Sequence, residues 1–93
     1  MINTNIFVND TFRALSVLYD LRDDKNLIRI TQQELADVLQ ISRPTVNIIF
    51  TKLRNEGYLM QDKDRVAHYY LTVDAIKVIK MFRKLEQQNN KRE

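Results

Sequence analysis

The sequence predicts a mainly α-helical domain that carries a small β-ribbon. Three observations support this fold class. The only proline, Pro44, and the only glycine, Gly57, bracket one helical stretch. A helix-capping sequence begins at Thr31, and short runs of strand-forming residues follow Gly57. The expected order is helix, short strand, helix, helix, two-stranded ribbon, helix.

Size and composition limit the class of protein. The 93 residues suffice for one small domain, so we expect a single domain over residues 1–93. A content of 44% apolar and 29% charged residues is typical of a soluble protein. No apolar run could span a bilayer, and the first ten residues do not resemble a signal peptide. We therefore expect a cytoplasmic protein with no membrane partner; the lack of cysteine excludes disulfides and thiolate chemistry.

The positive charge is concentrated at one end of the chain. The net charge is +3, yet residues 31–72 carry five basic and five acidic side chains. The last 21 residues carry six basic and three acidic ones. Proteins that hold DNA through phosphate contacts usually have a more basic surface. The central segment can therefore offer only a few well-placed cations.

The first third of the chain predicts one helix and one short strand. We expect the helix over residues 10–22, because its apolar residues recur at helical spacing. Its start can be capped by Asn9, Asp10 or Thr11. A polar turn follows, and the apolar-rich segment 27–30 predicts a brief strand.

Two consecutive short helices are predicted next. Thr31 and Glu34 fit a capping box, in which each side chain accepts a backbone N–H of the other residue. Ser42 can cap the second helix, Pro44 fits its first turn, and Gly57 ends it after about Glu56. The inward face of the first of these helices is expected to comprise Leu35, Ala36, Val38 and Leu39.

The last third predicts a ribbon and a final helix. Residues 58–61 and 66–71 read as two strands around the charged turn 62–65. A helix over residues 74–88 then places most of its basic residues away from an apolar side. That apolar side comprises Ala75, Val78, Ile79, Phe82 and Leu85.

The segment from Leu35 to Val46 carries a family resemblance. Its pattern, Leu-Ala-x-x-Leu-x-Ile-Ser-Arg-x-Thr-Val, resembles that of the winged helix-turn-helix DNA-binding family, with the ribbon as the wing. The resemblance covers roughly residues 10–85. In such a unit Ala36 is small because the two helices cross closely, and Ile41 fills the turn. The second helix is anchored in the core by Val46, Phe50 and Leu53.

The resemblance implies that the second of these helices contacts the major groove of DNA. Arg43 can donate two hydrogen bonds to guanine or contact a phosphate, and Asn47 can pair with adenine. The alternative for each residue is an ordinary solvated side chain. The candidate DNA-binding residues of this helix are Ser42, Arg43, Pro44, Thr45, Asn47, Ile48, Lys52 and Arg54.

Two residues depart from the family pattern, and the wing adds two more candidates. Gln40 occupies the turn position where glycine is usual, which costs on the order of 1 kcal/mol if the residue needs a positive φ. Ile48 replaces a frequent base-reading arginine; it either touches thymine methyl groups, favouring an A/T-rich site, or packs against other parts of the protein. Lys63 and Arg65 at the wing tip can reach the minor groove.

The two flanking helices, residues 10–22 and 74–88, are expected to pair two copies of the chain. Their apolar residues exceed what a small core needs, and the spacing in the last helix resembles a short heptad seam. The alternative is packing within the same chain. A two-fold dimer implies a repeat-containing DNA site. The candidate interface residues are Phe12, Leu15, Tyr19, Val78, Ile79, Phe82 and Leu85.

Nothing in the sequence indicates catalysis or a cofactor. His68 is the only histidine, and no cluster completes a metal site around it. No nucleophile-and-base pair is apparent, and one glycine cannot form a phosphate-cradling loop. We therefore expect a protein that is not an enzyme, with no metal site.

Three functions remain open. The leading hypothesis is sequence-specific binding of double-stranded DNA by a small dimeric transcription regulator. The segment Gln40–Val46 also resembles that of plasmid- or phage-encoded centromere-binding adaptors. This resemblance implies a segregation motor protein as partner and repression of the adaptor's own operon. The third hypothesis is a winged helix used only for protein contacts.

Overall fold

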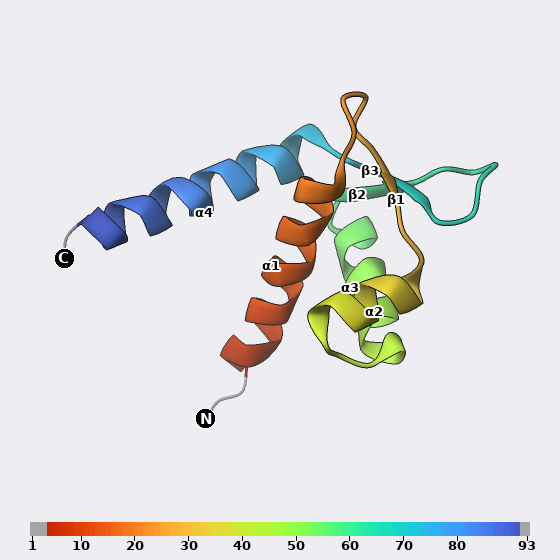
Figure 1. The fold of residues 1–93 in the computed structure, drawn as a ribbon, viewed down its shortest axis with the longest axis horizontal. Helices are drawn as coiled ribbons and strands as arrows, with labels where there is room; N and C mark the ends of the chain where they lie inside the picture. Colours follow the sequence, from red (N-terminus) through yellow and green to blue (C-terminus); the bar gives the residue numbers. More distant parts are fainter. Residues whose placement is uncertain (1–3, 92–93) are drawn as a thin grey trace.

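Four helices and three short strands follow one another in the predicted order. The computed structural model describes the backbone of residues 4–91 and the side chains of residues 10–87. The elements are α1 (Thr4–Leu21), β1 (Leu27–Arg29), α2 (Gln32–Leu39), α3 (Arg43–Asn55), β2 (Leu59–Gln61), β3 (His68–Leu71) and α4 (Val73–Lys91). This arrangement confirms the predicted winged helix-turn-helix fold (Figure 1).

The three strands form one antiparallel sheet in the order β1-β3-β2. Leu27 pairs with Tyr70 on one side of β3, and Leu59 pairs with Leu71 on the other. The brief strand expected after the first helix therefore joins the ribbon. Alternate side chains of the sheet face the core, which places Ile28 and Tyr69 inside.

Helix α1 begins earlier than predicted. It starts at Thr4, so the expected start near residue 10 was wrong, and Asn9, Asp10 and Thr11 lie inside the helix rather than at its cap. Polar capping residues favour a helix start without enforcing one. Residues 4–9 contain no proline or glycine that would interrupt the helix, so it extends across them.

Helices α2 and α3 pack on α1 and on the sheet around one core. Leu35, Ala36 and Leu39 of α2 are buried there, as predicted. Val38 is 58% exposed, so its predicted inward position was wrong. It lies on the far side of Leu35 from the other two, outside the arc of α2 that meets its neighbours.

Helix α4 packs over its first half only. Ala75 and Ile79 are fully buried. Farther along, Met81, Phe82 and Leu85 are exposed, although Phe82 contacts α1 through Phe12. Figure 1 shows α4 extending away from α2, α3 and the sheet, at the opposite end of the molecule from the wing loop. The helix runs three residues beyond the predicted Gln88 and one residue before the predicted start.

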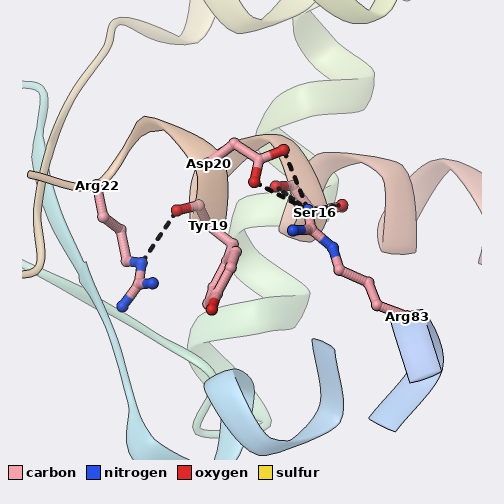
Figure 2. Close-up of polar contacts among 5 residues, drawn as sticks. All are labelled: Ser16, Tyr19, Asp20, Arg22 and Arg83. Carbon is pink, nitrogen blue, oxygen red and sulfur yellow. Dashed lines mark hydrogen bonds and ion pairs between the residues drawn. The ribbon is translucent and has the colours of Figure 1, made fainter. Parts of the chain in front are cut away.

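A polar cluster joins α1 to α4 where the two helices separate. Nη2 of Arg83 donates to Ser16 Oγ at 2.7 Å and to both carboxylate oxygens of Asp20 at 3.0 Å (Figure 2). The guanidinium of Arg83 also lies 4.9 Å from the ring centre of Tyr19, and that of Arg22 lies 3.9 Å from it. The cluster fixes the position of α4 against the C-terminal half of α1.

The wing strands are shorter than predicted. Val66 and Ala67 were expected in the second strand but lie outside it, and Tyr58 lies outside the first. Ala67 adopts a φ of 63°, which interrupts the extended backbone. Its carbonyl still accepts the Ile30 N–H at 3.0 Å. The loop of residues 62–67 is therefore joined to the sheet by hydrogen bonds at both of its ends.

Candidate nucleic-acid interface

The turn between α2 and α3 has the geometry that the sequence predicted. Gln40 has a φ of 59°, and the Ile41 N–H donates to Ala36 O at 3.1 Å. Ser42 caps α3, because the Thr45 N–H donates to its Oγ at 3.2 Å. Both ends of the turn are thus held by hydrogen bonds, and the start of α3 is fixed relative to α2.

The other end of α3 and its buried face are equally well defined. Gly57 has a φ of 80°, and the Tyr58 N–H closes the end with a 2.8 Å bond to Leu53 O. Val46, Phe50 and Leu53 are buried as predicted, and Ile49, which was not singled out, is buried beside them. Four anchors in thirteen residues leave one face of α3 for solvent or a ligand.

That exposed face carries the central candidate residues. Arg43, Pro44, Asn47 and Ile48 are all exposed, and Thr45 is half-buried. The hydroxyls of Ser42 and Thr45 lie 2.7 Å apart, so one donates to the other. Ile48 is 54% exposed and is therefore not covered by its own chain. This exposure excludes packing of Ile48 against its own chain. Contact with thymine methyl groups and contact with a second copy of the chain are the two interpretations that stay open.

Lys52 and Arg54 take different positions from these residues. Both are half-buried. Nη1 of Arg54 donates to Oε1 of Gln61 in β2 across 3.5 Å, a long contact that directs Arg54 towards the base of the wing. Lys52 lies along the grooves that flank α3. Neither belongs to the cluster at the start of α3.

A hydrogen bond between α2 and α3 was not foreseen. Nε2 of Gln32 donates to Oδ1 of Asn47 at 3.2 Å. Gln32 is the first residue of α2, directly after the Thr31 cap. The two residues lie fifteen positions apart on different helices, so no local pattern in the sequence signals this contact.

The wing tip presents its two cations to solvent. Lys63 and Arg65 are exposed. The neighbouring Asp62 is half-buried, and its Oδ1 accepts the Asp64 N–H at 2.8 Å. That bond, helped by the Tyr70 hydroxyl and by Arg65, holds the pKa of Asp62 below its usual value. The Asp62 carboxylate thus stabilises the turn, while Asp64 remains exposed.

The candidate dimer residues fall into two groups. Leu15 and Ile79 are 4% and 0% exposed, so their prediction as interface residues is corrected: they belong to the core of their own chain. Phe82 and Leu85 are about half exposed, at 47% and 48%. Phe82 lies 4.9 Å from Phe12 between ring centres. The remaining candidates are half-buried: Phe12, Tyr19 and Val78.

Other kinds of site receive no support from the described residues. Among them, no three acidic, histidine or cysteine side chains gather in a way that could bind a metal ion. None of the described helices combines the length and apolar character needed to cross a membrane. The exposed face of α3 and the wing tip are therefore the candidate functional surfaces among the described residues.

Comparison with known families identifies this unit. Residues 13–71, from α1 to the end of β3, match the model of the Crp-like helix-turn-helix domain. The match covers more than half of the chain. The chain belongs to the family of Crp-like helix-turn-helix domains. Helix α4 lies outside the matched residues.

Solved structures share the fold of this chain. MepR, a transcription regulator of the Staphylococcus aureus multidrug efflux pump MepA, is 25% identical with a TM-score of 0.68. The match covers 91% of this chain but 64% of MepR, so the chain spans less than two thirds of that regulator. No curated protein sequence matches the chain.

Two further structures agree in fold alone. The S. aureus MepR–DNA complex is 23% identical with a TM-score of 0.70, and the match covers 88% of this chain and 66% of that one. The reduced CO-sensing protein from R. rubrum is 18% identical with a TM-score of 0.66, over 80% of this chain and 37% of that one. The Crp-like domain here therefore shares its fold with proteins that are longer than this chain.

Proposed function

We propose that this chain is a transcription regulator that binds specific double-stranded DNA sites through α3 and the wing. The observation that carries the proposal is the face of α3. Its boundaries are fixed at Ser42 and Gly57, and it exposes Arg43 and Asn47 beside its buried anchors. A short, firmly held helix with polar residues at its start suits the major groove. The DNA complex of MepR, which shares this fold, supports the same use here.

The start of α3 combines base and phosphate contacts. Arg43 is exposed and can donate two hydrogen bonds to guanine O6 and N7. Ser42 and Thr45 share one hydroxyl bond, so one hydroxyl proton of the pair remains for a phosphate oxygen. Pro44 has no N–H that would need a partner in the first turn of α3. We assign Arg43 to a contact with a base, and the hydroxyl groups of Ser42 and Thr45 to contacts with the phosphate backbone of the DNA.

The preference for A/T-rich DNA rests on two exposed features. Ile48 is exposed in the middle of the contact face, where it can meet thymine methyl groups. Lys63 and Arg65 lie at the tip of the wing, and a narrow A/T minor groove attracts such cations. Lys52 and Arg54, which lie farther along α3, are assigned to backbone phosphates at the edges of the site.

The regulator acts as a homodimer in this proposal. The distal half of α4 leaves the body of the molecule with Met81, Phe82 and Leu85 exposed. A projecting helix with an apolar side gains stability when a second copy covers it. Phe12, which contacts Phe82, and Val78 border that side and complete the interface. Tyr19 lies against the guanidinium groups of Arg22 and Arg83, so we place it at the edge of the interface; Leu15 and Ile79 do not take part. Two copies imply two half-sites in the DNA.

The alternatives are less well supported. The structural relatives are a transcription regulator and a CO-sensing protein, which favours regulation over DNA segregation with a motor protein. A role in protein binding alone does not account for the exposed Arg43 and Asn47 side chains of α3. The absence of binding to any duplex would leave that role as the surviving one.

The test is selection of binding sites from random duplex DNA, followed by affinity measurements. We expect the wild-type protein to enrich a sequence containing two related half-sites. Arg43→Ala should then weaken binding to the selected duplex by about 1–3 kcal/mol, with little change on unrelated duplexes. Equal weakening on all duplexes would instead assign Arg43 to phosphate.

A further inference from the structure

We infer that Gln32 is a positioning residue that holds Asn47 in the orientation needed to recognise adenine. This inference rests on the proposed function. Its basis is the bond from Gln32 Nε2 to Asn47 Oδ1 at 3.2 Å. The bond joins two helices across fifteen positions of sequence. It is a contact between a residue on α2 and a residue in the middle of the exposed face of α3.

Gln32 extends from a backbone that is held on both sides. The Thr31 N–H donates to Glu34 Oε1 at 2.8 Å, and the Glu34 N–H donates to Thr31 Oγ1 at 3.0 Å. This capping box fixes the first turn of α2. Ala36 is 1% exposed in the core between α2 and its neighbours, so α2 cannot shift without unpacking it. The amide of Gln32 therefore approaches Asn47 from a fixed origin.

The bond decides which end of the Asn47 amide faces which way. An asparagine that pairs with adenine must accept from N6 and donate to N7. The Asn47 oxygen has two lone pairs, and Gln32 uses one, which leaves the other for adenine N6. In this structure Gln32 donates, so a flip of the Asn47 amide alone would set two N–H groups against each other. A phosphate oxygen that accepts the second N–H of Gln32 would keep the Gln32 amide from flipping together with it. Without Gln32 the amide can exchange its oxygen and its NH2 group, and the preference for adenine weakens.

Gln32 can also connect Asn47 to the DNA backbone. Its Nε2 carries two hydrogens, and one of them is used in the bond to Asn47. In a helix-turn-helix the leading helix crosses the sugar–phosphate backbone. The second N–H is then available to a phosphate oxygen. The chain phosphate–Gln32–Asn47–base would fix the reading side chain with respect to the groove.

The experiment compares four proteins on selected DNA: wild type, Gln32→Ala, Asn47→Ala and the double variant. Sites are selected from random duplexes, and affinities are then measured for the selected duplex and for versions with one base pair exchanged. Gln33→Ala is the matched control, because Gln33 is the next residue of α2 and its Nε2 donates to Asp37 Oδ1 within the same helix at 3.0 Å. Circular dichroism confirms that each variant is folded.

We expect the wild type to prefer one A·T pair by about tenfold or more, the discrimination of a bidentate contact. Asn47→Ala should remove that preference, and Gln32→Ala should reduce it at the same base pair by several-fold. The double variant should lose no more of the preference for the A·T pair than Asn47→Ala does, since Gln32 acts on that preference through Asn47. Gln33→Ala should keep the wild-type preference.

Two results would overturn the inference while leaving the proposed function intact. One is a Gln32→Ala protein that keeps the full preference for the A·T pair. The other is a loss of affinity in Gln32→Ala that is equal on all duplexes and persists in the Asn47→Ala background, which would make Gln32 a phosphate contact only. A wild-type protein that enriches no duplex would overturn the proposed function and this inference together.

Discussion

Arg83 of α4 and Asp20 of α1 form an ion pair in which one guanidinium nitrogen lies 3.0 Å from both carboxylate oxygens. The same nitrogen donates to Ser16, so one side chain joins α4 to two positions of α1. The contact between the Phe82 and Phe12 rings lies next to this pair and also joins α4 to α1. The ion pair therefore contributes to the direction of the helix that we assign to dimerisation.

Arg83→Ala should loosen α4 with little effect on the rest of the fold. The side chains of Arg83 and Asp20 are 35% and 63% exposed, so water screens their attraction. We expect a loss of about 1 kcal/mol or less in the free energy of unfolding. Hydrogen exchange in the second half of α4 should nevertheless be faster in this variant than in the wild type, while exchange in α2 and α3 should stay the same. Lys84→Ala, at the next and exposed position of α4, is the control and should leave exchange unchanged.

Leu85→Glu should separate the dimer. Leu85 is 48% exposed on the distal part of α4, where a carboxylate would have to enter an apolar contact between two copies. Sedimentation equilibrium should show a dissociation constant raised at least tenfold. Gln87→Glu adds the same charge on a different side of α4 and should leave the dimer intact. A wild-type protein that sediments as a monomer at high concentration would remove the dimer from the account.

Gln40→Gly should stabilise the protein. Gln40 holds a φ of 59°, which costs a residue with a side chain about 1 kcal/mol relative to glycine. Part of this gain is lost because glycine has more freedom in the unfolded chain. Urea denaturation should therefore show an increase of roughly 0.5 kcal/mol in the free energy of unfolding. A decrease would mean that the Gln40 side chain makes a stabilising contact.

Gly57→Ala should have the opposite effect. Gly57 has a φ of 80°, and a methyl group built there meets no atom within 4 Å. The change therefore introduces backbone strain without a steric clash, and we expect a loss of about 1 kcal/mol in the free energy of unfolding. The same denaturation measurement tests both turns of α3. An unchanged stability would show that the turn relaxes to accept alanine.

Acidification should loosen the wing. The Asp62 pKa lies below its usual value of 3.8, chiefly because the carboxylate accepts the Asp64 N–H. A lowered pKa in the folded protein gives stability that is complete above the usual pKa and is lost as the pH falls through the folded one. A carboxyl NMR titration should place the Asp62 midpoint below 3.8. Tyr70→Phe removes one donor and should move that midpoint upwards; no movement would exclude the Tyr70 bond.

Residues with strong local preferences were predictable from the sequence. Thr31, Ser42 and Gly57 fix helix ends by local hydrogen bonds or by backbone freedom, and all three hold the predicted places. The start of α1 was missed because several capping residues occur inside the helix. Val38 was missed because an apolar residue in a short helix can lie on either side of its boundary, and only the neighbouring helices decide which side is covered.

Contacts between elements were harder to foresee. The Gln32–Asn47 bond and the Arg83–Asp20 pair join residues on different helices, so neither leaves a periodic pattern in the sequence. The division of α4 into a buried half and an exposed half depends on how far along its length α4 stays in contact with α1. Helical periodicity shows which side of a helix is apolar without showing what covers that side. Leu15 and Ile79 were therefore assigned to a dimer interface, although they lie in the core of their own chain.

The salt dependence of binding to duplex DNA distinguishes a DNA-binding regulator from a winged helix that contacts only proteins. The duplex is the one enriched from random sequences by the wild-type protein, and an unrelated duplex of equal length is the comparison. Sequence-specific DNA binding predicts that the logarithm of the affinity falls linearly with the logarithm of the salt concentration, with a slope equivalent to a few phosphate contacts. It also predicts tighter binding to the enriched duplex at every salt concentration. The absence of binding to either duplex at about 50 mM salt would contradict the account.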